Sequence, residues 1–312
     1  MSYQRLASLL VIFLAIDVTA NAQNGGAARE SYTRGQQRFS AGDLDGAILY
    51  FTRAIELSQG NSKNLQQWNS GSQPAKDGPG ARPIAILDPF VANVYSDRAV
   101  AHYARGNLEA AAVDCESAIA IDPGVAQAYN TRGNIRWSKG DADGAFTDFE
   151  RAIAIDPDAP DPYNNRANVC RLKGDLEGAL ADSDMAIARA PRRAEYLCNR
   201  AQTRQEKGDH AAAMVDFDMS ISLNPRLAGC YVARGRAHLE ARDSKRAISD
   251  FNRAIDLDPD LGLAYGNRGL AFLLQDREDD AQKDFARCLT LYPAFRPALE
   301  RLIDSAKRER KQ

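Results

Sequence analysis

The side chains of this sequence that could do chemistry together are arginines and aspartates that recur at a fixed interval. Arginine returns every 34 residues at Arg98, Arg132, Arg166, Arg200, Arg234 and Arg268, with a further one at Arg34. Aspartate follows sixteen positions after each of the six, at Asp114, Asp148, Asp182, Asp216, Asp250 and Asp284. Such columns could hold a charged ligand or pair with each other. Because an unpaired buried charge is costly, we predict a structural ladder of Arg–Asp pairs.

Histidine and cysteine, the other candidates for chemistry, form no recognisable site. His102 and His238 occupy the same repeat position four repeats apart, so they cannot share a metal ion. The five cysteines are odd in number and match no zinc or redox spacing. No metalloprotease, phosphate-loop or nucleophile-elbow motif occurs. We therefore expect no catalytic, metal-binding or cofactor-binding residue, and a protein that is not an enzyme.

The elements that position these columns follow from the same interval. Proline recurs every 34 residues, at Pro89, Pro123, Pro157, Pro191, Pro225, Pro259 and Pro293. A period of 34 is the signature of stacked helix-turn-helix units, each of which buries its apolar face only against its neighbours. Proline cannot continue a helix and restricts the residue before it. The Asp-Pro pairs therefore mark the ends of second helices.

Several other columns repeat with the prolines. The segment from Tyr129 to Gly133, followed by Gly140-Asp141, Ala145, Phe149, Ala152 and Asp156-Pro157, carries them in order. This pattern resembles the tetratricopeptide repeat family, with repeats of the Asn-Arg-Gly type, over residues 28–295. The resemblance implies an all-α fold, a right-handed superhelical α-solenoid of about seven helix-turn-helix repeats. It also implies a protein or peptide as the binding partner.

The repeats divide the chain unevenly. We assign residues 28–61 to the first repeat and 92–295 to repeats two to seven. Residues 62–91 interrupt the period. Loops of this length are uncommon inside compact domains and tend to be functional or disordered, and we predict a disordered loop. Residues 296–312 are expected to form a capping helix that closes the stack, followed by a polar tail.

The first 22 residues resemble a secretory signal. An apolar run from Leu6 to Ile16 is too short to span a bilayer as a helix, and Ala20-Asn21-Ala22 supplies small residues at a cleavage site. We expect residues 1–22 to be removed, 23–27 to be a linker, and the mature chain to lack a stable membrane insertion. The protein would then be exported, and periplasmic or secreted in a bacterium.

A stripe of amides on the first helices is the candidate binding surface. Asparagine both donates and accepts hydrogen bonds, so stacked amides suit the backbone of an extended peptide. We predict a concave peptide-binding groove lined by Asn130, Asn134, Trp137, Asn164, Asn165, Asn168, Asn199 and Gln202. The open alternative is that these asparagines only solvate an exposed helix.

A second function remains in contention. The same stripe becomes apolar in the last repeat, at Leu263, Leu270, Leu273 and Leu274. These leucines would suit a structural subunit that docks into a larger exported assembly. The net charge of −2 does not favour a nucleic-acid partner. The sequence leaves the partner's identity and the oligomeric state open.

Overall fold

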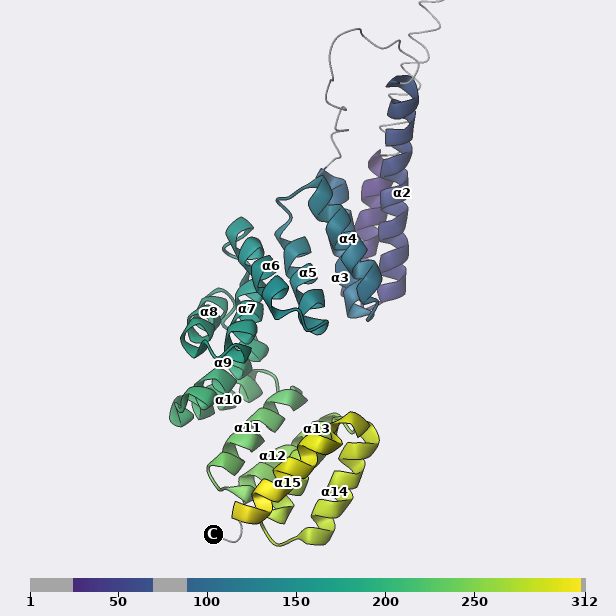
Figure 1. The fold of residues 1–312 in the computed structure, drawn as a ribbon. Coiled ribbons are helices and arrows are strands. Elements are labelled where there is room, and N and C mark those ends of the chain that lie inside the picture. Colours follow the sequence, from purple (N-terminus) through teal and green to yellow (C-terminus); the bar gives the residue numbers. More distant parts are fainter. Residues whose placement is uncertain (1–24, 70–88, 310–312) are drawn as a thin grey trace, which may run out of the picture. The chain divides into compact units, whose positions relative to one another are not determined.

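The computed structural model describes residues 25–69 and 89–309, and all regular elements in these ranges are helices (Figure 1). The predicted signal peptide, most of the predicted insertion and the last three residues lie outside the described residues. The chain divides into two compact units, one ending at Pro157 and one beginning at Asp158.

Unit 1 consists of three helical hairpins. The first joins a helix at residues 25–40 to α2, Leu44–Asn69. The second joins α3, Pro89–Ala104, to α4, Leu108–Ile121. The third joins α5, Ala126–Ser138, to α6, Ala142–Ile155. Since α2 continues to Asn69, residues 62–69 of the predicted insertion are helical and extend the first repeat. Residues 89–91, also assigned to the insertion, are helical and form the start of α3.

Unit 2 consists of four hairpins and a closing helix. The hairpins are α7 with α8 (Pro160–Leu172, Leu176–Arg189), α9 with α10 (Ala194–Lys207, His210–Leu223), α11 with α12 (Ala228–Glu240, Ser244–Leu257) and α13 with α14 (Gly262–Leu273, Glu278–Leu291). A 3₁₀ turn, η1 at Pro293–Phe295, leads into α15, Arg296–Glu309. The capping helix thus begins where the sequence predicted.

Within each unit, every first helix packs against the next first helix and against the second helix that precedes it. Contacts run from α3 to α5 in unit 1, and from α7 through α9 and α11 to α13 in unit 2. α15 packs on α13 in the same manner. This is the packing of stacked helical hairpins, so the predicted all-α solenoid class is confirmed. We call the surface made by these helices the first-helix face of each unit.

Glycine ends the first helix of each early hairpin. Gly140, for example, has φ +83°, a left-handed conformation that costs glycine little. In the last two hairpins Arg242 and Asp276 replace this glycine and still adopt φ near +60°. The turn geometry is therefore set by the packing of the hairpin, and these two side chains tolerate a conformation that L-residues rarely adopt.

Aromatic rings fill the interior of several hairpins opposite small residues. A Cβ atom on Gly133 would come within 2.5 Å of the Phe149 ring, and one on Gly235 within 2.6 Å of Phe251. These glycines thus admit a phenylalanine from the facing helix, a fit that close-packed interiors require. Where the glycine is replaced by Ala99, the facing residue is the smaller Cys115.

None of the described helices combines the length and apolar character needed to cross a membrane.

Candidate functional site

The predicted Arg–Asp ladder is present, and each pair lies inside one hairpin. In the second hairpin Arg98 Nε and Nη2 donate to the two oxygens of Asp114 at 2.8 and 2.7 Å. The same two-pronged contact recurs in the other five pairs, at Arg132–Asp148, Arg166–Asp182, Arg200–Asp216, Arg234–Asp250 and Arg268–Asp284. The six aspartates are all buried. Paired hydrogen bonds of this kind are strong and fix geometry.

In several pairs the third nitrogen of the guanidinium extends the ladder to the preceding hairpin. Arg200 Nη1 donates to Asp184 at 2.7 Å, and Arg234 Nη1 donates to Asp218 at 2.6 Å. These acceptors lie two residues after a ladder aspartate. Polar side chains recur at this position in the sequence, and that column could have predicted the link between hairpins. The ladder therefore holds each hairpin together and, at these positions, also ties it to its neighbour.

The first hairpin has no Arg–Asp pair of its own, although Arg98 Nη1 of the second hairpin donates to its Thr52 Oγ1 at 2.9 Å. Its sixteenth position after Arg34 is Tyr50 instead of aspartate. Arg34 is accordingly exposed and pairs with Glu30 on its own helix at 2.7 Å. An exposed pair of this kind contributes little to stability, so the structural role of the arginine column begins at Arg98.

Two histidines join the ladder instead of forming a metal site. His102 Nε2 lies 3.9 Å from Asp114 Oδ2, and His238 Nε2 lies 3.9 Å from Asp250 Oδ2. Burial lowers the pKa of both rings more than the neighbouring carboxylates raise it. In the part of the chain that the structure describes, no cluster of His, Cys, Asp and Glu could hold a metal ion.

The five cysteines are buried free thiols. Burial raises the pKa of Cys115 to about 12, which suppresses the reactive thiolate.

In unit 2 the predicted asparagines lie on the first-helix face and contact one another. Asn199 Nδ2 of α9 donates to Asn164 Oδ1 of α7 at 2.9 Å. Asn164 Nδ2 lies 3.4 Å from Asn165 Oδ1. Asn164 is 8% exposed. Its amide therefore contacts one amide of its own helix and one of the neighbouring hairpin, and it positions Asn199 more than it faces solvent.

Two other amides of this face keep their hydrogen-bonding capacity. Asn168 is half-buried, and its side chain has no hydrogen-bond partner among the described residues. Gln202 occupies the same repeat position on α9, and its Nε2 reaches only Cys198 of its own helix, at 3.5 Å from the carbonyl oxygen and 3.9 Å from Sγ. Contacts of these lengths are weak. Asn168 and Gln202 are therefore the amides best able to bind a ligand in unit 2.

In unit 1 the three predicted residues lie on α5. Asn130 is buried at 5% exposure, whereas Asn134 and Trp137 are half-buried. Neither the Asn134 amide nor the Trp137 indole has a hydrogen-bond partner within the described residues. As in unit 2, the earlier asparagine of the helix is buried and the later one is available.

Comparisons with known families decide what kind of repeat this is. Four family models match: a TPR repeat at residues 133–170, and tetratricopeptide repeats at 91–121, 194–227 and 232–294. Together they cover slightly more than half of the chain. The chain belongs to the tetratricopeptide repeat family. Its fold is typical of protein–protein interaction modules, and proteins of this family are generally non-catalytic scaffolds.

Solved structures agree on the fold. A tetratricopeptide repeat protein from Parabacteroides merdae ATCC 43184 is 15% identical with a TM-score of 0.61, over 91% of this chain and 100% of its own. The Cut9–Hcn1 hetero-tetramer of APC/C is 16% identical with a TM-score of 0.64, over 84% of this chain and 49% of that chain. PilW, a type IV pilus biogenesis factor, is 19% identical with a TM-score of 0.58, over 65% of this chain and 94% of its own. A search of curated protein sequences finds no significant match.

The leucines of the last tetratricopeptide repeat lie mostly beneath the closing helix. Leu273 is 3% exposed and belongs to the same buried cluster as Leu299 of α15. Leu270 and Leu274 pack against this cluster, and only Leu263 is largely exposed, at 45%. The apolar stripe of α13 faces the place that a further first helix would occupy, and α15 fills it. The predicted docking patch is thus largely covered by the chain's own capping helix.

Proposed function

We propose that this tetratricopeptide repeat protein is a non-catalytic binding module that holds an extended peptide segment of a partner protein on its first-helix faces. The observation that carries the proposal is the pair Asn168 and Gln202. Both amides are half-buried at the same repeat position on adjacent helices, and both retain unused donors and acceptors. Leaving buried polar groups unpaired costs free energy, and a peptide backbone would supply the missing partners.

The spacing of the helices supports an extended ligand. Packed helices lie about 8–10 Å apart, and an extended chain rises about 3.3 Å per residue. A peptide crossing α7 and α9 would therefore present a backbone amide to each helix about every third residue. Asn199, held in place by Asn164, would add a further acceptor on α9.

The test begins with a linear peptide selected from a random displayed library against the purified chain. Its affinity is then measured for the wild type and for the double variant Asn168→Ala/Gln202→Ala. Losing hydrogen bonds worth about 1–3 kcal/mol should weaken binding about 10- to 100-fold. The matched control is Gln282→Ala on α14, an exposed amide remote from the first-helix face. Equal affinity of the double variant and the control would refute the assignment of this face.

We also propose export, on the strength of residues 1–22 of the sequence. N-terminal sequencing of the mature protein should begin at Gln23, and a retained Met1 would contradict this.

The alternative function is a structural subunit that docks through the last repeat. Exposed Leu263 and Leu302 would then carry the contact. Changing both to serine should dissociate a stable complex in sedimentation experiments while leaving peptide affinity unchanged. The binding-module proposal predicts the reverse pattern for the Asn168→Ala/Gln202→Ala variant.

A further inference from the structure

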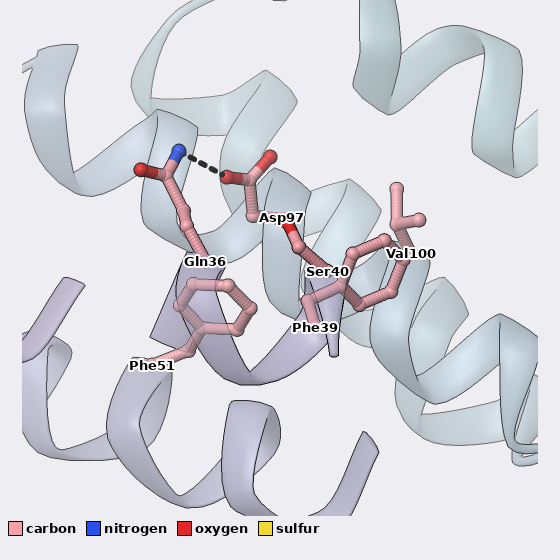
Figure 2. Close-up of a pocket in the computed structure, with 6 residues that line it drawn as sticks. All are labelled: Gln36, Phe39, Ser40, Phe51, Asp97 and Val100. Atoms are coloured by element: carbon pink, nitrogen blue, oxygen red, sulfur yellow. Dashed lines mark hydrogen bonds between the residues drawn. The ribbon is translucent and has the colours of Figure 1, made fainter. Parts of the chain in front are cut away.

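A pocket of about 380 Å³ opens in unit 1 between the helix at residues 25–40, α2 and α3 (Figure 2). Its lining combines one carboxylate, an amide and a hydroxyl with apolar side chains, namely Asp97, Gln36, Ser40, Phe39, Phe51 and Val100. Asp97 and Val100 occupy the same repeat positions on α3 as Asn165 and Asn168 on α7. The pocket therefore belongs to the first-helix face of unit 1. Its volume lies in the range of pockets that hold small ligands.

Asp97 uses only one of its two oxygens within the protein. Tyr32 OH donates to Oδ2 at 2.8 Å, and Gln36 Nε2 donates to the same oxygen at 3.3 Å. No described residue donates to Oδ1. Figure 2 shows Gln36 directed at one oxygen while the other points away from it. A carboxylate can accept about four hydrogen bonds, so Asp97 retains acceptor capacity on the side of Oδ1.

Asp97 also lacks a cation, unlike the ladder aspartates. Each of the six has an arginine at 2.7–2.9 Å, but no described Lys, Arg or His forms an ion pair with Asp97. Cations on α3 and on the helix at residues 25–40, which both line the pocket, are engaged elsewhere. Arg98 pairs with Asp114, Arg34 pairs with Glu30, and Arg29 lies over the Phe90 ring.

The position of Asp97 is costly for the chain alone. Burial raises its pKa above the usual range of aspartate, although the hydrogen bonds from Tyr32 and Gln36 lower it in part. A half-buried carboxylate is stabilised when a cation approaches it. A partner that brings a cation to Oδ1 would therefore gain more from this contact than from a solvated surface carboxylate.

We propose that this pocket binds a lysine or arginine side chain of the partner peptide, with its cationic group paired to Asp97 Oδ1. Phe39 and Val100 line the pocket, so their apolar surfaces would accept the methylene stem of the side chain. The assignment rests on the proposed function and adds the chemistry of the partner at one position. A metal ion is not favoured as the occupant, because the six lining residues include a single carboxylate.

The test uses four acetylated and amidated pentapeptides with alanines around a central residue, which is arginine, lysine, citrulline or norleucine. Each is titrated onto the full chain and followed by NMR. The arginine and lysine peptides should bind about tenfold more tightly than the citrulline and norleucine peptides, as expected for one charge-assisted contact. In Asp97→Asn the four affinities should agree to within about twofold. The control Asp279→Asn, at an exposed position of α14, should keep the full preference.

A second variant protects the test against a misfolded Asp97→Asn. Val100→Arg places a guanidinium of the chain's own one helical turn from Asp97, which should occupy the pocket and remove the preference. Equal binding of all four peptides to the wild type, or a preference that persists in Asp97→Asn, would overturn the assignment.

The outcomes separate this inference from the proposed function. Equal binding of the four pentapeptides, together with a loss of affinity of the selected library peptide for Asn168→Ala/Gln202→Ala, would leave the peptide-binding face standing and remove only the cation pocket. A charge preference of the pentapeptides, together with unchanged affinity of the selected peptide for Asn168→Ala/Gln202→Ala, would do the opposite. Equal binding of the pentapeptides with unchanged affinity of the selected peptide would reject both.

Discussion

The ladder aspartates and Asp97 are the same residue type in two differently built regions. Asp216 is 2% exposed and contacts Arg200 and Arg204 at 2.8 Å. Asp97 is half-buried and receives only neutral donors on one oxygen. The first arrangement satisfies a charge completely inside the chain, whereas the second leaves it without a cation. The comparison suggests that the paired charges hold the fold and that the incompletely paired groups serve a partner.

The amides repeat this contrast. Asn164 is buried and bridges Asn199 and Asn165, whereas Asn168, one turn later, is half-buried with its amide unused. Two residues of the same type on the same helix thus differ in their hydrogen bonds, and we infer different roles for them. Sequence position alone does not reveal this difference.

The largest expected effect comes from removing a ladder aspartate. Asp216→Ala should destabilise the protein by about 2–4 kcal/mol, because it leaves Arg204 without a carboxylate and Arg200 with only the exposed Asp184. Urea unfolding followed by circular dichroism measures this. The matched control is Asp218→Ala, an exposed aspartate two residues later that pairs with Arg234; it should cost less than about 1 kcal/mol. Equal losses in both variants would mean that burial does not distinguish the ladder.

A somewhat smaller loss of stability should follow when the arginine and the aspartate of one ladder pair are both replaced. Asp284 is contacted by Arg268, with Phe272 at the position where two other hairpins carry Arg136 and Arg204. Arg268→Met/Asp284→Leu should cost at least about 1 kcal/mol less than Asp284→Ala, because the double change leaves no buried charge unpaired. A double variant that is less stable than the single one would show that the pair itself contributes the stability.

The two asparagines of α7 should separate stability from binding. Asn164→Ala should lower the free energy of unfolding by about 1 kcal/mol, because it removes hydrogen bonds at a buried site. Asn168→Ala should change stability by less than about 0.5 kcal/mol, as surface changes usually do. Thermal melts of the two variants measured side by side test this contrast, which disappears if both shifts are the same.

The smallest effect on stability is a gain. Because burial raises the pKa of Asp97, ionising it costs the folded state more than the unfolded state. This penalty is absent below the unfolded pKa and grows as the pH rises through the window up to the raised folded pKa. Asp97→Asn should therefore melt slightly above the wild type at neutral pH, and the gain should shrink as the pH falls through that window. A variant that melts below the wild type at neutral pH would indicate that the carboxylate is compensated inside the fold.

The 34-residue interval predicted most of the fold because each repeat position has the same structural role in successive hairpins. The stack of helical hairpins, the start of α15 and the six Arg–Asp contacts followed from it. The continuation of α2 to Asn69 did not, because the interval is lost after Leu57 and composition there favoured a loop.

The site was predicted less completely, because it depends on contacts between hairpins. Column spacing placed Asn164 and Asn168 on one face. It could not show that the Asn164 amide is already hydrogen-bonded to Asn199. It also could not show that α15 covers Leu273. Asp97 was missed because a single carboxylate in a column of mixed residues carries no periodic signal. Its significance appears only beside the six paired aspartates.

The most direct test of the account is the affinity of the selected linear peptide for Asn168→Ala/Gln202→Ala, measured with the unfolding midpoint of the same variant. The account predicts a 10- to 100-fold loss of affinity, about 1–3 kcal/mol, at an unchanged midpoint. Unchanged affinity, or a loss accompanied by an equal loss of stability, would contradict the claim that the unpaired amides of the first-helix face exist for a partner.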